Sequence, residues 1–270
     1  AVKLIAAFDH RDIFIDPDPD PALSYDERKR IFDLPRSSWE DYNKKLISKG
    51  GGIYSRRAKS IPLNAQMKEL FGFNDETNSA TPSDLIRAIL KSHIDLLWFG
   101  GIGTYVKAHS ESNSQVGDRA NDLIRINGKE LNCKVIGEGG NLGCTQLGRI
   151  EYCLNGGMMN TDAVDNSAGV DCSDNEVNIK ILLNSIVADG TLTVKQRDKL
   201  LEAMTDDVAE LVLRDNYLQT QAISLAKSSS VRQLDSFIRY LDELEKSANL
   251  DRELEFLPND EELVEREEHA

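Results

Sequence analysis

Apolar and polar residues along the chain follow two different periods. Short apolar runs bounded by Gly, Asn or Asp predict buried strands at residues 2–8, 11–15, 94–99 and 133–138. Longer segments with apolar residues at helical spacing predict helices at residues 25–34, 37–47, 81–92 and 145–156. This alternation is typical of an α/β fold. We expect a Rossmann-like, largely parallel sheet flanked by helices, in which ligands bind beyond the carboxyl ends of the strands.

Local signals support two of the predicted helices. Thr81, followed by Pro82 and Asp84, has the residue types that begin a helix, because the hydroxyl accepts from a free backbone N–H and proline needs no donor there. Ser37 and Glu40 have the spacing of a capping box. We therefore expect helices to begin near residues 37 and 81.

The middle and the end of the chain carry further signals. Asn127-Gly128 lies between two alternating arms, which predicts a β-hairpin. Residues 158–169 are expected to form a strand and a loop. From residue 191 the chain becomes a series of amphipathic helical segments, the first with Thr193 and Gln196 at capping-box spacing.

Composition excludes several classes of function. The net charge of −14 argues against a nucleic-acid partner, because phosphate binding needs clustered Lys and Arg. No apolar run approaches the roughly 20 residues of a membrane span, so we expect a soluble, cytoplasmic protein without a membrane partner. The four cysteines form no CxxC pair and the four histidines lie far apart, which predicts reduced thiols and no metal site. The chain begins inside an apolar run without Met, which indicates a piece of a longer polypeptide.

The segment KVIGEGGNLGCTQ, residues 134–146, is a strand that runs into a loop with four glycines. Glycines allow the backbone to approach a flat or phosphorylated ligand, and Asn141 offers both a donor and an acceptor. The loop could be a dinucleotide fingerprint with Asp162 as the ribose carboxylate, but the third glycine would stand at Leu142. The alternative ribose carboxylate is Asp9, which residue type alone equally interprets as a turn aspartate.

Other residues have simpler interpretations. Trp98 is expected in the core. Asp118 and Arg119 either anchor a substrate or form a salt-bridged loop, and the sequence does not decide between them.

Several long segments, in order, resemble the large NAD-specific glutamate dehydrogenases of bacteria: LIAAFDHRDIFIDP, PRSSWEDY, IDLLWFGGIGTYVKA, KVIGEGGNLGCTQLGRIEY and NTDAVDNSAGVDCSDNEVNIKILL. The resemblance continues through DNYLQTQAISLA and LDRELEFLPNDEEL. It implies that the chain is the later part of the catalytic region. Residues 1–175 would be an incomplete NAD-binding Rossmann-like domain that lacks its first strand and glycine fingerprint, and residues 176–270 a C-terminal helical segment.

The resemblance also implies a cofactor site. In the superfamily a loop that reads roughly EGANGPTT faces the nicotinamide half of the cofactor, and EGGNLGCT, with Gly139 and Asn141, takes its place here. Asn166 of DNSAG matches an asparagine that contacts the same half. Gly100 and Gly101 match a pair of small residues under the cofactor.

Two further residues follow from the resemblance. Asp9 matches the carboxylate that binds the adenosine ribose, which favours NAD over NADP, although the nearby Arg11 could accommodate an extra phosphate. Ser173 matches a serine that contacts the side-chain carboxylate of glutamate. The residues themselves favour a capping box of Ser173 with Glu176 that opens a helix with Val177, Ile181 and Ile186 on its buried face, and the two roles could coincide.

The implied reaction is the NAD-dependent oxidation of L-glutamate to 2-oxoglutarate and ammonia. The lysine and carboxylate that act as acid and base in the superfamily lie in a preceding domain, so we expect no catalytic residue here and no activity from the chain alone. The longer protein is expected to be a homo-oligomer. The alternatives are a noncatalytic nucleotide-binding regulatory module and a related amino-acid dehydrogenase with another substrate.

Overall fold

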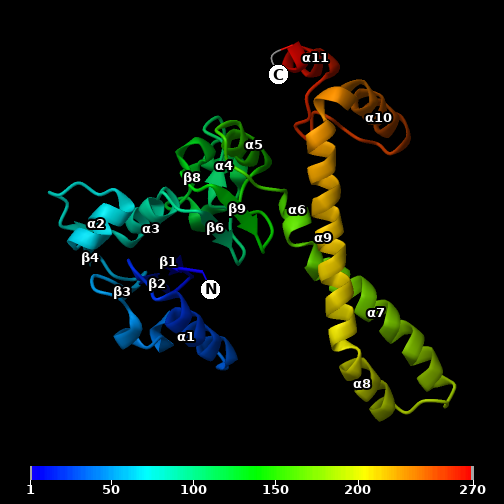
Figure 1. Cartoon of the computed structure of the whole chain (residues 1–270), viewed down its shortest axis with the longest axis horizontal. Coiled ribbons are helices and arrows are strands. Elements are labelled where there is room, and N and C mark those ends of the chain that lie inside the picture. The colour runs from blue at the N-terminus through cyan, green and yellow to red at the C-terminus, as the bar shows by residue number, and fades with distance from the viewer. Residues whose placement is uncertain (1, 269–270) are drawn as a thin grey trace. The chain divides into compact units, whose positions relative to one another are not determined.

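The computed structural model describes residues 2–268, and the chain divides into two compact units (Figure 1). One unit comprises the residues up to Trp98 with 103–136 and 148–159, and the other comprises 99–102, 137–147 and the residues from 160 onward. Helices alternate with small parallel and antiparallel sheets, so the predicted α/β class is confirmed at this level. The expected division after residue 175, which lies within a helix, stays a prediction about the longer protein.

The first unit begins with an antiparallel sheet of β1 (Ala6–Phe8), β2 (Asp12–Ile15) and β3 (Gly52–Ser55). Every residue of β2 is buried, which confirms the strand that its apolar run predicts. Helix α1 (Pro21–Asp33) follows, and the Asp20 carboxylate caps it by accepting from the backbone N–H groups of Ala22 and Leu23.

The remaining elements of this unit are short. They are β4 (Ile61–Pro62) paired antiparallel with β5 (Ser79–Ala80), helices α2 (Ala65–Phe71), α3 (Pro82–Leu90) and α4 (Asn113–Val116), and β7 (Val106–Lys107) paired parallel with β8 (Ile126–Asn127). The Thr81 hydroxyl accepts from the backbone N–H of Asp84, which confirms the predicted start of α3. Leu85, Ile86 and Leu90 of α3 are fully buried and form part of the core.

Strands β6 (Leu96–Phe99) and β9 (Val135–Glu138) form a two-stranded sheet, and helix α5 (Gln146–Leu154) follows β9 as predicted. In the second unit the helices are α6 (Asp162–Asp165), α7 (Ser167–Ala188), α8 (Val194–Ala203), α9 (Thr205–Ser229), α10 (Leu234–Ser247) and α11 (Asp260–Glu268). Figure 1 shows the long helices α7 and α9 in contact. Thr193 and Gln196 form the predicted capping box of α8. No helix of the described residues is long and apolar enough to cross a membrane.

The structure corrects three predicted elements. Residues 37–47 form two 3-10 turns, Trp39–Asp41 and Lys44–Leu46. The backbone N–H of Asn43 donates to the Glu27 carboxylate, so it is not available for the hydrogen bond that a continuous helix would make. The capping box there pairs Ser38 with Asp41, so the predicted pair of Ser37 with Glu40 is wrong.

The prediction of a β-hairpin at Asn127-Gly128 is also wrong. Strand β8 pairs in parallel with β7, and Asn127 forms a capping box with Glu130 at the start of a 3-10 turn. A Cβ atom at position 128 would lie 2.5 Å from the carbonyl oxygen of Gly148, so Gly128 permits a close approach of two backbones. The predicted strand near residue 158 reduces to a single parallel bridge between Met158 and Val135.

Candidate functional site

Two glycine loops follow the strands β6 and β9. The backbone N–H of Val135 donates to the carbonyl of Asp95 (3.0 Å), and that of Gly140 donates to the carbonyl of Phe99 (3.1 Å). The partners advance in the same direction along both chains, so the strands are parallel and their carboxyl ends lie at one edge. The loop at residues 100–102 and the loop at residues 139–143 therefore begin side by side.

The glycines of these loops divide into two groups. A Cβ atom on Gly140 would lie 2.9 Å from the carbonyl oxygen of Gly101, and one on Gly143 would lie 2.9 Å from both a Glu138 oxygen and the Phe99 ring. These two glycines allow the loops to pack on each other. Gly100, Gly101, Gly139 and Asn141 are exposed, so they present backbone and one amide side chain to the outside.

Three carboxylates hold the glycine loop, and of these the sequence singled out Asp162 alone, as a possible ribose ligand. Glu138 is fully buried, and its Oε1 accepts from the backbone N–H of Cys144 (3.1 Å). From α6, Asp165 Oδ2 accepts from the N–H of Glu138 (3.0 Å), and Asp162 Oδ2 accepts from that of Leu142 (2.8 Å). Asp162 thus binds the loop backbone. Glu138 and Asp165 have no sequence signal beyond their place in GEGG and TDAVD, beside the glycines and Asn166.

Asn166 lies between α6 and α7, with non-helical dihedral angles (φ −110°, ψ 16°). Its side-chain Nδ2 is buried and has no hydrogen-bond partner among the described residues. A buried amide donor without a partner is uncommon and calls for an explanation such as a ligand. Asn166 is therefore the site residue whose environment best fits the binding of an acceptor group.

Ser173 lies inside α7, not at its start. The helix begins at Ser167, and the Ser173 hydroxyl donates to the carbonyl of Gly169 (3.4 Å), so the predicted capping role is wrong. Glu176 forms an ion pair with Lys180. Ser173 is exposed, which leaves its predicted contact with a substrate carboxylate open as a prediction.

The buried face expected on this helix is also wrong in part. Val177 and Ile181 are 47% and 63% exposed, whereas Leu183 is buried. Leu183 is apolar like its exposed neighbours, so the local pattern could not select it.

The helices α7 and α9 also bring two carboxylates together. Burial raises the pKa of Asp171, and repulsion from Asp215 on α9 raises it further. The Oδ2 atom of Asp171 is buried, and no donor among the described residues lies within hydrogen-bond geometry of it. The pair places two neighbouring carboxylates near the α6–α7 junction. The described residues contain no group of His, Cys, Asp and Glu side chains that could hold a metal.

Asp9 belongs to the other unit. Its Oδ1 accepts from the backbone N–H groups of Arg11 (2.7 Å) and Asp12 (2.8 Å), which is the geometry of a turn aspartate between β1 and β2. The turn interpretation is therefore confirmed. Binding of the adenosine ribose by the same carboxylate stays a prediction.

The structure also tests the predictions for Trp98, Asp118 and Arg119. Trp98 is 59% exposed, so its prediction as a core residue is wrong. Strand alternation explains this, because Leu97 and Phe99 take the buried positions of β6.

Asp118 Oδ2 accepts from the N–H of Thr104 and the amide of Asn121.

Burial opposes ionisation of Asp118, but these two hydrogen bonds and the buried Arg125 keep its pKa below the usual range. Arg125 also forms an ion pair with Asp122 and donates to the carbonyl of Thr104. Asp118 therefore holds a loop together with Arg125, and Arg119 is not the partner in this arrangement.

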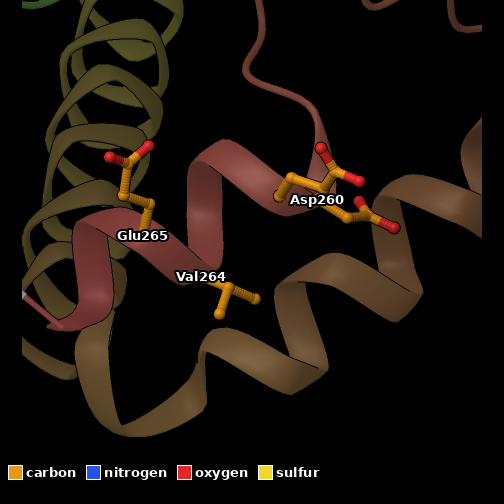
Figure 2. Close-up of a pocket in the computed structure, with 4 residues that line it drawn as sticks. Asp260, Val264 and Glu265 are labelled. Carbon is orange, nitrogen blue, oxygen red and sulfur yellow. The ribbon is translucent and has the colours of Figure 1, made fainter.

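The hollow in Figure 2 is separate from these residues. It is lined by Asp260, Glu261, Val264 and Glu265 of α11, and Figure 2 shows the carboxylates of Asp260 and Glu265 on the same short helix as the Val264 side chain. Three of the four lining residues are acidic, so the hollow would repel the phosphates of a nucleotide. The candidate site is instead the open surface of the two glycine loops and the α6–α7 junction.

These features define an α/β protein whose glycine loops leave one edge of a parallel strand pair. Residues 1–226 match the family described as bacterial NAD-glutamate dehydrogenase, catalytic domain. The chain therefore belongs to this family, which confirms the resemblance.

Curated relatives extend the match. The chain is 57% identical over 268 residues to the NAD-specific glutamate dehydrogenase of Halomonas elongata, 56% over 265 residues to that of Pseudomonas aeruginosa, and 53% over 271 residues to that of Mycobacterium tuberculosis. These alignments cover 98% to 99% of the chain. The chain spans only 16% to 17% of the length of these relatives.

Proposed function

We propose that the chain is the cofactor-binding part of an NAD-dependent glutamate dehydrogenase, with a Rossmann-like arrangement around β6 and β9. The observation that carries the proposal is the junction of two glycine loops at the carboxyl ends of parallel strands, beside an asparagine with an unpartnered buried amide. Ligands of α/β sheets bind at such strand ends. Family membership supplies the chemistry that this surface would serve.

In the proposed site the exposed Gly100, Gly101 and Gly139 let the cofactor lie close to the backbone. Asn141 and Asn166 bind its nicotinamide half through their amides. The Asn166 Nδ2 can donate a hydrogen bond to the cofactor. Because this atom is buried, such a hydrogen bond is stronger than one at the protein surface. NAD, when bound, accepts the hydride from the substrate's α-carbon.

The remaining roles are positional. Asp9 would accept hydrogen bonds from the adenosine ribose and disfavour a 2'-phosphate, and Ser173 would contact the side-chain carboxylate of L-glutamate. Oxidation yields an imine, and water then gives 2-oxoglutarate and ammonia. The groups that move protons are expected outside this chain, so its own contribution is to hold and orient the cofactor.

The test uses the full natural polypeptide that carries this sequence. Formation of NADH is followed by absorbance with a panel of amino acids, for the unaltered protein, Asn166→Ala and Asn178→Ala. Asn178 is a matched control because its amide donates to the carbonyl of Asp174, within α7.

We expect turnover with glutamate, a kcat/KM for NAD about tenfold lower in Asn166→Ala, and an unchanged value in the control. No turnover with any amino acid would contradict the proposal and favour a noncatalytic nucleotide-binding module. Turnover with a different amino acid alone would instead indicate a related dehydrogenase.

A further inference from the structure

We propose that Asn216 of α9 is a positioning residue for the cofactor site. It would hold the α6–α7 junction in the shape that presents Asn166 to the nicotinamide half of NAD. This inference rests on the proposed function, because it assigns a task to a residue that the cofactor need not touch. Sequence pattern alone treats Asn216 as one polar position in an amphipathic helix.

The contacts of Asn216 fall on both sides of Asn166. Its Nδ2 donates to the carbonyl of Val164 (2.8 Å) and to the hydroxyl oxygen of Ser167 (3.0 Å). Val164 lies in α6, one residue before its end at Asp165, and Ser167 begins α7, so one amide joins the two helices that Asn166 separates. Both contacts span about fifty residues of sequence, which makes them tertiary and not local.

Asn216 is a side-chain donor to this junction from a distant helix. Asn166 has non-helical dihedral angles and caps neither helix with its side chain. The carbonyl of Val164 lies in the last turn of α6, where it accepts from the backbone N–H of Asn166, and the Asn216 amide is its donor from outside the two helices. The Asn166 side chain makes no capping hydrogen bond to α7, so the direction of its amide depends on the shape of the junction that Asn216 contacts.

Helix α9 is itself fixed where this contact is made. Val212, one turn before Asn216 and on the same face, is only 3% exposed. Thr220, one turn later, donates to the carbonyl of Asn216 (3.2 Å). The Asn216 side chain is therefore presented from a packed stretch of helix, as a positioning residue requires.

The effect reaches the glycine loop through α6. This helix has four residues, and two of them, Asp162 and Asp165, accept hydrogen bonds from the backbone of Leu142 and Glu138. A short helix has little stability of its own. Release of the junction would therefore loosen both Asn166 and the loop with Asn141, which are the two amides proposed for the nicotinamide half.

The experiment separates this role from general stability. In the full natural polypeptide, the dissociation constants of NAD and ADP are measured by calorimetry for Asn216→Ala, Ser167→Ala, Asn166→Ala and the control Asn178→Ala. ADP keeps the adenosine and diphosphate groups but lacks the nicotinamide half. Loss of a positioning hydrogen bond should weaken NAD about fivefold in Asn216→Ala and leave ADP within about twofold.

Ser167→Ala removes one of the two acceptors and should weaken NAD by a smaller factor, and it carries the test if Asn216→Ala does not fold. The control should change neither constant. An equal loss for NAD and ADP in Asn216→Ala would mean a structural role only and overturn the inference.

Two further outcomes separate the proposals. If Asn166→Ala weakens NAD while Asn216→Ala and Ser167→Ala do not, the inference fails and the proposed function stands. If Asn166→Ala leaves NAD binding unchanged, the proposed function fails, and the inference fails with it.

Discussion

At the scale of single residues, the glycine loops show that neighbouring glycines have different tasks. Gly140 faces the backbone of the other loop, where a Cβ atom would lie 2.9 Å from the carbonyl oxygen of Gly101. Gly101 itself has open space where its Cβ atom would lie. The sequence GEGGN does not distinguish these roles, because each depends on a segment about forty residues away.

Gly140→Ala should therefore destabilise the protein, whereas Gly101→Ala should not. The added methyl group at position 140 meets backbone, which cannot rotate away, and overpacking of this kind costs roughly 1–3 kcal/mol. At position 101 we expect a change within about 0.5 kcal/mol, since alanine there meets no atom within 4 Å. Urea unfolding of both variants measures the difference. Equal stability of the two variants would show that the loops do not touch as described.

Leu142 occupies the position at which the loop after β9 departs from the dinucleotide fingerprint. The fingerprint would require glycine at this position, and Leu142 has a positive φ of 61°, a conformation that glycine adopts more readily. The Asp162 carboxylate accepts the N–H of Leu142 (2.8 Å) and so supports this conformation from twenty residues away. The sequence identified neither this conformation of Leu142 nor the contact with Asp162 that stabilises it.

At the scale of elements, Glu27 joins α1 to the turns that follow it. Its side chain is 7% exposed and accepts from the Arg30 guanidinium (2.6 and 2.8 Å) and from the backbone N–H of Asn43 (2.6 Å). The hydrogen bond from Arg30 lowers the pKa of Glu27, against the opposing effect of burial, and Asn43 lowers it further. The ionised carboxylate is thus the form that the folded protein favours.

Glu27→Gln should lower the free energy of unfolding by about 1–2 kcal/mol at pH 7, because charged hydrogen bonds become neutral ones. A folded-state pKa below the unfolded value of 4.5 means that the stabilisation is present above that value. It is lost as the pH falls through the folded-state pKa, so the variant and the unaltered protein should converge in acid. Asp26→Asn, an exposed change on the same helix, is the control for loss of charge. A difference that persists unchanged at low pH would contradict this account.

Elements were predictable where their signals are local. Thr81 caps α3 through an N–H three residues away, and Thr193 does the same for α8, so the sequence alone identified both helix starts. Ser173 had the same spacing to Glu176, but α7 had already begun at Ser167. A capping box is therefore a reliable signal only where the preceding residues cannot continue a helix.

At the scale of the whole molecule, the sequence predicted the α/β class but not the pairing of its strands. Among the described residues the sheets are small and two of the four are antiparallel. The pairing could not be predicted, because it depends on residues far apart in the chain. Amphipathic C-terminal helices were also expected, and the helices are present. Their apolar residues remain largely uncovered, since Ile181 and Leu182 on α7 and Leu213 and Tyr217 on α9 are 62% to 69% exposed.

This exposed apolar surface predicts that the isolated chain self-associates. Contiguous apolar surface on a soluble protein usually binds a partner or another copy, and the curated relatives are about six times longer than this chain. Light scattering should show species larger than a monomer, together with binding of a hydrophobic dye. Ile181→Lys combined with Leu213→Lys should reduce both signals, because lysine at exposed positions keeps its charge in water. The paired control Lys180→Arg with Arg214→Lys changes neighbouring positions without altering the apolar surface. A monodisperse monomer that binds no dye would show that these helices need no cover.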